Sequence, residues 1–340
     1  MLYPLLLKPV YKDYVWGGNK IIQTFGRNEP PGIYAESWEV SDRNDGMSII
    51  ENGSLKGKSL HEILQKNKTV LLGRDSHFAS FPLLIKIIDA QQNLSVQVHP
   101  DDTSSKIYGG EAKTESWVVL DTNQDSIFYA GFNQNYPKDE IIRKLPSDEI
   151  LSLLRTVHAK NDDVIFIPGG RLHAIGAGNM VFEVQQNSNT TYRVYDFERG
   201  RPLHMKEAQS VIHFDDIDNP IVNPVILEKT PNYRRTQLIK CPYFIIEKWE
   251  IFVRDKSDES VTKYGTYNRD DFKKHPINDK DYINIEFKLW DVLGAKMVDG
   301  FSLTTTPRSW RRVGHKISDK VYERLTGESG YFDTRIIYVA

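Results

Sequence analysis

Two histidines, a glutamate and a glutamine form the set of side chains in this sequence that is best suited to chemistry. His99, Glu115 and His173 supply two imidazoles and a carboxylate, a common ligand set for a catalytic divalent metal, and Gln97 can add a carbonyl oxygen. Each residue alone has a plainer interpretation, because a single histidine at a strand end is more often a hydrogen-bonded structural residue. Only the combination makes a metal site a working hypothesis.

The segment around Gln97 and His99 has the alternation of a β-strand, which would carry both side chains on one face. Its alternate residues divide into a polar face and an apolar face, Ser95, Gln97 and His99 against Leu94, Val96 and Val98. The β-branched valines favour a strand over a helix. A strand with one apolar face and one polar face is typical of a β-barrel that has a polar pocket inside an apolar shell.

Several separated motifs resemble type I mannose-6-phosphate isomerases of the short bacterial branch. The core motif is FPLLIKIIDAQQNLSVQVHP at 81–100. It is followed by KTESW at 113–117, IPGGRLHA at 167–174 and QQNSNTTYRVYD at 185–196, and preceded by VWGG at 15–18 and AESWEVS at 35–41. The motifs occur in the family's order, so the resemblance is specific, and it extends over residues 1–250.

The resemblance implies one zinc ion per chain, held by Gln97, His99, Glu115 and His173. It also implies a fold of two cupin barrels with zinc only in the first. The corresponding activity is the interconversion of mannose 6-phosphate and fructose 6-phosphate, an aldose–ketose isomerisation through a cis-enediol. A divalent metal would act there as a Lewis acid.

Five further residues correspond to positions around the substrate in that family. Arg193 corresponds to its active-site arginine and Glu183 to an acidic residue of the pocket, while Lys86, Ser95 and Lys113 lie at positions near the substrate. Lys113 and Glu183 are both candidates for the proton-transfer base. Their alternatives are a phosphate or hydroxyl binder for Lys113, and for Glu183 a partner that orients His173 or a lysine.

Arg193 also has two interpretations. A guanidinium offers paired donors that suit a phosphate or an enediolate oxygen. The alternative is a structural ion pair with Asp196 or Glu198.

Two other functions remain open at this point. Two histidines and one carboxylate also form the facial triad of Fe(II) enzymes, so a metal-dependent cupin oxygenase is one alternative. Gln97, the lysines and Arg193 argue against it, because an apolar substrate has no use for that charge. The other alternative is a catalytically silent cupin that binds sugar phosphates.

The pattern of short strands with glycine and proline between them predicts a mainly β fold, a bicupin with a few short helices inserted. We expect a zinc-binding catalytic domain with a helical insertion at 1–220 and a second cupin-like domain at 221–340, of which 252–340 is atypical. A capping box at Ser59–Glu62 predicts a helix, and a helical hairpin is expected at 138–144 and 147–157. A strand is expected at 283–289, and much of 253–280 reads as a loop or as disordered.

Composition narrows the class of protein. The chain has 340 residues, a formal net charge of −2 and a single cysteine, Cys241. The charge gives no indication of a nucleic-acid or membrane partner, and one cysteine excludes both an intrachain disulfide and a cysteine-based zinc site. We therefore expect a cytoplasmic enzyme. The resemblance implies that its partner is a small sugar phosphate, and we expect a monomer or homodimer.

Overall fold

The computed structural model describes residues 3, 5–73, 77–230, 233–251, 254–255, 283–291 and 296–305. The chain divides into two compact units. The larger comprises Pro4–Asn223 with Cys241–Phe244, and the smaller comprises Met1–Tyr3, Pro224–Lys240 and Ile245–Ala340. The residues of the predicted pocket all belong to the larger unit.

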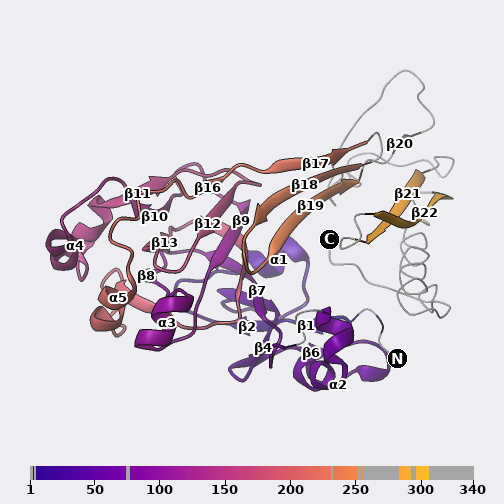
Figure 1. Ribbon diagram of the computed structural model, residues 1–340, viewed down its shortest axis with the longest axis horizontal. Coiled ribbons are helices and arrows are strands. Elements are labelled where there is room, and N and C mark those ends of the chain that lie inside the picture. The colour runs from indigo at the N-terminus through magenta and orange to yellow at the C-terminus, as the bar shows by residue number, and fades with distance from the viewer. Residues whose placement is uncertain are drawn as a thin grey trace. The chain divides into compact units, whose positions relative to one another are not determined.

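Two antiparallel sheets form the larger unit (Figure 1). The seven-stranded sheet runs in the order β16 (Ile221–Val222), β12 (Val164–Ile167), β9 (Glu115–Asp121), β14 (Asn179–Gln186), β7 (Leu83–Ala90), β3 (Glu36–Val40) and β2 (Val10–Lys12). The five-stranded sheet runs in the order β11 (Leu154–Val157), β10 (Phe128–Phe132), β13 (His173–Ile175), β8 (Val96–Val98) and β15 (Tyr192–Tyr195). Two short antiparallel pairs complete the unit. These are β1 (Leu7–Lys8) with β6 (Ile49–Ile50), and β4 (Asp42–Arg43) with β5 (Gly46–Met47).

The main hydrophobic core lies between the two sheets. It joins Ile88 and Trp117 of the seven-stranded sheet to Phe128 and Ile175 of the five-stranded sheet in one buried cluster. Burial of such large apolar side chains is the principal stabilising term of a sandwich of this kind. The fold class predicted from the sequence, mainly β with few helices, is confirmed.

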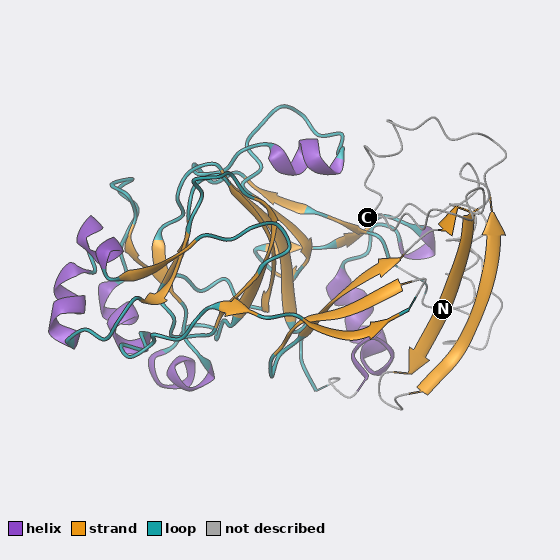
Figure 2. Cartoon of the chain, turned by 90° about the horizontal axis from the view of Figure 1, so that it is seen from above, coloured by secondary structure: helices purple, strands orange, loops and turns teal. Residues whose placement is uncertain are grey.

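Short helices cover the outer faces of both sheets. Valines of β8 pack with α4 (Lys138–Lys144) and α5 (Met205–Val211) in a second cluster, and these helices lie beside the five-stranded sheet in Figures 1 and 2. Ile21 of α1 (Lys20–Phe25) packs on Ile87 of β7 in a third cluster. The described chain also contains α2 (Leu60–Leu72) and α3 (Asp102–Tyr108), and none of its helices is both long and apolar enough to cross a membrane.

Most of the predicted helical segments are confirmed. Ser59 and Glu62 make the expected reciprocal capping box at the start of α2, and the first half of the expected hairpin is α4. The helix predicted for the second half, at 147–157, is wrong. Residues 147–157 form the 3₁₀ helix η3 (Asp148–Ser152) and then strand β11, because Leu154 and Val157 pair with β10. Pairing with a distant strand outweighs the local helical spacing.

One detail of the predicted polar strand is also wrong. Leu94 precedes β8 and packs in the core between the sheets, whereas Val96 and Val98 pack on the outer face with α5. The three residues do not share one face, because the strand begins only at Val96.

The smaller unit contains two three-stranded antiparallel sheets, described here by themselves. One is formed by β17 (Val225–Lys229), β18 (Tyr233–Lys240) and β19 (Ile245–Ile251), the other by β20 (Arg254–Asp255), β21 (Ile283–Asp291) and β22 (Lys296–Thr305). Strand β21 confirms the strand expected at 283–289. Apart from Arg254 and Asp255, the loop expected at 253–280 lies outside the described residues, and the second barrel stays a prediction.

Candidate active site

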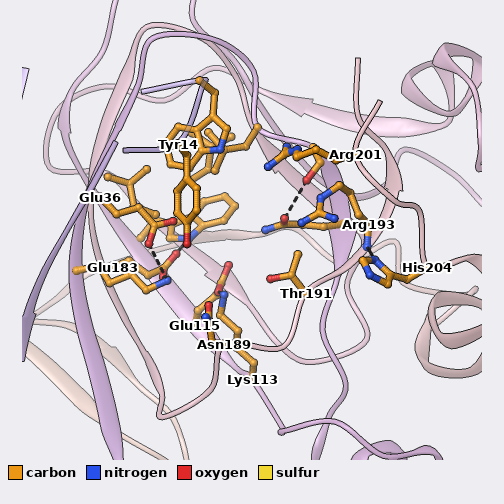
Figure 3. Close-up of a pocket in the computed structure, with 18 residues that line it drawn as sticks. Tyr14, Glu36, Lys113, Glu115, Glu183, Asn189, Thr191, Arg193, Arg201 and His204 are labelled. Carbon is orange, nitrogen blue, oxygen red and sulfur yellow. Dashed lines mark hydrogen bonds and ion pairs between the residues drawn. The ribbon is translucent and has the colours of Figure 1, made fainter. Parts of the chain in front are cut away.

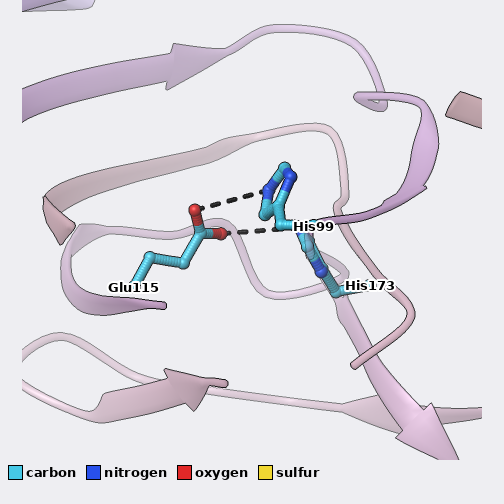
Figure 4. Close-up of side chains that lie close together, drawn as sticks. All are labelled: His99, Glu115 and His173. Carbon is cyan, nitrogen blue, oxygen red and sulfur yellow. Dashed lines mark ion pairs between the residues drawn. The ribbon is translucent and has the colours of Figure 1, made fainter. Parts of the chain in front are cut away.

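His99, Glu115 and His173 meet inside the larger unit, as Figure 4 shows. The Glu115 carboxylate lies 3.5 Å from His99 Nε2 and 3.4 Å from His173 Nε2, with one oxygen toward each ring. All three side chains are 1 % exposed. Within the described residues, neither ring nitrogen of His99 has a hydrogen-bond partner, and Glu115 Oε2 faces His99 and the Lys113 ammonium. Buried polar atoms without partners are rare, and His99 Nε2 faces the carboxylate at a spacing that would suit a shared metal ion.

Both imidazoles are held in the neutral form that a metal requires. Burial lowers the pKa of His173 to about 3, and burial followed by the Lys113 charge lowers the pKa of His99 well below its ordinary value. His173 Nδ1 donates to the Arg171 carbonyl over 2.9 Å, which leaves the lone pair of Nε2 facing Glu115. Burial and the Glu183 charge raise the pKa of Glu115 to about 7.

A row of side chains crosses the five-stranded sheet next to this cluster. Gln97 of β8 is the register partner of His173 on one side and of Arg193 on the other. The Gln97 amide nitrogen lies 3.4 Å from His173 Nε2, and its oxygen accepts a hydrogen bond from Ser95 over 3.2 Å. A half-turn of the amide would bring its oxygen to the cluster. Gln97 thus lies beside the cluster, and its part as a fourth ligand stays a prediction.

A second row crosses the seven-stranded sheet. Lys86 of β7 is the register partner of Trp38 on β3 and of Glu183 on β14, and Glu183 is in turn the partner of Trp117 on β9. Lys86 Nζ lies 3.2 Å from Glu183, and the Trp117 indole donates to Glu183 over 3.0 Å. The sheet register therefore brings a buried cation and a buried anion into contact.

This buried pair is charged on both sides. Burial by itself would lower the pKa of Lys86, but the carboxylates of Glu183 and Glu36 outweigh it and raise that pKa above its usual range. Burial would raise the pKa of Glu183, but Lys86 and Lys113 lower it below its ordinary value. Lys86 is therefore an ammonium and Glu183 a carboxylate.

Lys113 lies between the cluster and the pocket. Its Nζ is 2.9 Å from Glu115 Oε2, and both side chains are buried. An ammonium at this distance offsets part of the Glu115 charge. Because Lys113 also lines the cavity, its ammonium could reach a substrate bound next to Glu115.

A cavity of about 360 Å³ opens onto these groups (Figure 3). Lys86, Ser95, Lys113, Glu183 and Arg193, the five residues assigned to substrate or catalysis from the sequence, all line it. Of the proposed ligands, Gln97 and Glu115 also line it. The structure thus brings the five residues and two of the four proposed ligands to one pocket, while His99 and His173 contact Glu115 without lining it.

Arginines form the opposite side of the pocket. In Figure 3, Arg193 and Arg201 lie together across the cavity from Glu36 and Glu183. The Asp196 carboxylate binds Arg199 and Arg201, while Arg193 donates to the Pro202 carbonyl over 3.0 Å. The ion pair of Arg193 with Asp196 or Glu198 that the sequence allowed is not present among the described residues. Its Nε is buried and has no acceptor in the same part of the chain.

Comparison with known proteins gives a consistent family. A model of the phosphomannose isomerase type I catalytic domain matches residues 5–140. The probable mannose-6-phosphate isomerase GmuF of Bacillus subtilis is 37% identical over 278 residues, 78% of this chain and 84% of that protein. ManA of the same organism, a mannose-6-phosphate isomerase, is 37% identical over 73% of this chain and 79% of its own length.

The chain belongs to the type I mannose-6-phosphate isomerases. The crystal structure of the mannose 6-phosphate isomerase from Bacillus subtilis superposes with a TM-score of 0.69 at 31% identity, covering 75% of this chain and 82% of that one. The family drawn from the motifs is confirmed, and with it the assignment of this mannose-6-phosphate isomerase to the cupin fold.

A second similarity was not expected from the sequence. A stretch of 58 residues, 17% of the chain, is 66% identical to the Tol-Pal system protein TolB of Pelagibacter ubique and spans 13% of that protein. Because the stretch is so small a part of TolB, it carries no function of TolB over to this isomerase.

The sequence analysis missed several pocket residues, among them Glu36, Tyr14 and Arg201. Glu36 lies beside Lys86, Tyr14 stacks on Trp16 at 5.5 Å, and Arg201 pairs with Asp196. All three line the cavity. Glu36 stands inside the AESWEVS motif and Tyr14 directly precedes VWGG, so both carried a signal of position. Arg201 follows the last motif and carried none.

The metal site yields a direct prediction. We expect His99→Ala and His173→Ala each to abolish stoichiometric metal binding while the protein stays folded, because each removes one of few donors from a closed site. Metal analysis and circular dichroism of purified protein measure this. His61→Ala, at a half-exposed histidine paired with Asp42, is the control and should keep its metal. Stoichiometric metal in either active-site variant would contradict the ligand assignment.

The turn at Gly169 and Gly170 yields another prediction. Gly169 N donates to Thr114 Oγ1 and Gly170 N to the His99 carbonyl, so the turn joins the segments that carry Glu115 and His99. A Cβ on Gly169 would lie 2.6 Å from the Asp101 Cα. We expect Gly169→Ala to destabilise the protein by about 1–3 kcal/mol, as overpacking does, and to weaken metal binding.

Thermal unfolding and metal titration measure both effects. Gly32→Ala is the matched control, since its new Cβ would meet only Tyr34 at an ordinary 3.5 Å. Equal stability and metal affinity in the two variants would show that the turn tolerates a side chain.

Proposed function

We propose that this chain is a zinc-dependent isomerase that interconverts mannose 6-phosphate and fructose 6-phosphate through a cis-enediol. The observation that carries the proposal is the buried cluster of His99, Glu115 and His173, of which Glu115 lines one pocket with a pair of arginines. That arrangement suits a substrate with vicinal oxygens at one end and a phosphate at the other. Family membership favours this reaction over a cupin oxygenase.

The residues present fit zinc. Two neutral imidazoles and a carboxylate, with Gln97 as a further oxygen donor, form an N/O ligand set without thiolates, which suits a catalytic rather than a structural zinc. When bound, the ion would supply Lewis-acid polarisation of the substrate oxygens. The inner pocket also holds three carboxylates, Glu36, Glu115 and Glu183, against the two lysines, so a dication would offset an excess of buried negative charge.

The phosphate would bind at the arginine side. Burial and the nearby Arg201 charge lower the pKa of Arg193 from its usual high value, although the Asp196 carboxylate, which binds Arg201, offsets part of this repulsion. A phosphate between them would relieve this repulsion and use the free donor of Arg193. Lys86, on the side of Glu183, and Ser95, beside Gln97, would then contact the sugar.

The proton between C1 and C2 requires a base, and two candidates remain. Lys113 contacts Glu115 of the proposed metal site, and Glu183 is a carboxylate inside the same pocket. Lys86 is not a third candidate, because Glu183 and Glu36 keep it protonated. Its part is to donate to a substrate oxygen that gains negative charge.

A coupled assay tests the proposed function. Zinc-loaded protein should convert fructose 6-phosphate to mannose 6-phosphate, and treatment with a chelator should remove the activity until zinc is returned. Failure of fully zinc-loaded, folded protein to act on either sugar phosphate would leave only the silent binding protein.

Arg193 provides a prediction about the substrate. Arg193→Lys keeps the charge but loses the paired donors, and we expect kcat/KM to fall roughly ten- to hundred-fold. Steady-state kinetics measure this, with Arg143→Lys on the exposed face of α4 as the control. If Arg193→Lys matches the control, Arg193 has only a structural part.

Solvent isotope incorporation tests the proton route. An enzymic base can exchange its proton with solvent before it returns the proton, so turnover in heavy water should place deuterium on C1 of fructose 6-phosphate or C2 of mannose 6-phosphate. Proton NMR of the products measures it. If both carbons stay fully protonated after many turnovers, and Lys113→Ala and Glu183→Gln both remain active, a hydride shift becomes the better account.

A further inference from the structure

Glu36 makes an unusual set of contacts for a residue outside the predicted site. It lies on β3, is 8 % exposed and lines the cavity. Its Oε2 accepts a hydrogen bond from the Trp38 indole over 2.7 Å and lies 3.4 Å from Lys86 Nζ. Figure 3 shows Glu36 on the same side of the pocket as Glu183. One carboxylate oxygen of Glu36 is therefore fixed between an indole and an ammonium.

Lys86 consequently has two carboxylate partners. Glu183 lies 3.2 Å away on the other neighbouring strand, and the Trp38 ring packs under the ammonium at 5.5 Å. Trp38 is both the register partner of Lys86 and the donor to Glu36, so one residue supports both members of the pair. A lysine that only needed a counter-charge would be satisfied by one carboxylate.

The second partner matters because Glu183 faces the reaction. On the proposed function, Glu183 either takes up a proton or contacts the substrate, and in both cases it becomes a weaker partner for Lys86. An ammonium that is 4 % exposed is strongly destabilised when it is left without an anion. Glu36, anchored by Trp38, remains in place through that change.

We propose that Glu36 is a positioning residue that holds the Lys86 ammonium in its substrate-facing place while Glu183 takes part in the reaction. The inference rests on the proposed function, since it assigns Glu36 a part in that same reaction. Glu36 need not touch the sugar, and it acts through Lys86.

Glu36→Gln is the main test. The amide oxygen can still accept from Trp38, so the shape is kept, and the negative charge next to Lys86 is lost. We expect kcat to fall by roughly ten-fold or more, as for the loss of a charge-assisted hydrogen bond, with KM changed much less and metal content unchanged. Glu36→Asp keeps the charge on a shorter side chain, and its kcat should lie between those of Glu36→Gln and the wild type.

The matched control is Glu39→Gln, on the same strand. Glu39 pairs with Arg27 at 2.8 Å and does not line the cavity. Glu39→Gln therefore removes a comparable ion pair, and kcat should stay within about two-fold of wild type, as for a partly exposed pair that contributes little.

Chemical labelling gives a readout that does not depend on turnover. Limited acetylation with acetic anhydride, followed by peptide mass spectrometry, measures how much of each lysine is the free amine. In Glu36→Gln, Lys86 should be acetylated several-fold faster than in the wild type, while Lys113 and the α4 residue Lys138 keep their wild-type rates.

The outcomes separate the two proposals. If the wild type is inactive but Lys86 is labelled faster in Glu36→Gln, the isomerase function is rejected. The stabilisation of the Lys86 ammonium by Glu36 is still supported. An active wild type in which Glu36→Gln matches Glu39→Gln in kcat, or in which Lys86 labelling is unchanged, would overturn the inference. So would a Glu36→Asp variant that is no more active than Glu36→Gln.

Discussion

The pocket depends on the mutual compensation of charges that are buried inside a β-sandwich. Lys86, Glu183, Glu115 and Lys113 are each at most 4 % exposed, and an isolated charge at such depth would be strongly destabilising. Each cation here has a carboxylate within 3.2 Å. The same contacts fix the protonation states, because Lys86 is held as an ammonium and Glu183 as a carboxylate. Stability and chemistry therefore rest on one set of contacts.

Sheet register is what places these charges together. In antiparallel pairs, directly opposed side chains lie on the same face and in contact range. Lys86 and Glu183 are far apart in the sequence but are neighbours across two strands. The same holds for Gln97 with His173 and with Arg193. The two rows belong to different sheets that share one core, so the cavity between them has one wall from each. A slip of one residue in either sheet would turn these side chains to the opposite face.

The walls of the cavity differ in charge, and this difference orients a substrate. Carboxylates and lysines gather on the side of the candidate metal site, and Arg193 and Arg201 lie across the cavity from Glu36 and Glu183. An anionic group on a sugar would be drawn to the arginines, which leaves its other end for the cluster. The similarity of this mannose-6-phosphate isomerase chain to its Bacillus subtilis relatives extends over 73–78% of its length, and the larger unit alone contains every residue of this arrangement.

By itself, the sequence determined the family and the side chains gathered around His99, because the motifs and their order can be read directly from the chain. It also determined the β-rich class and the α2 capping box, because these depend on the spacing of neighbouring residues. It did not determine the strand at Leu154–Val157, whose pairing with β10 overrides a helical spacing. Nor did it assign Glu36 or Arg201 to the pocket. Glu36 reaches Lys86 only because β3 lies beside β7, and Arg201 reaches the cavity through Asp196. These contacts join residues by long-range pairing, which only the tertiary structure decides.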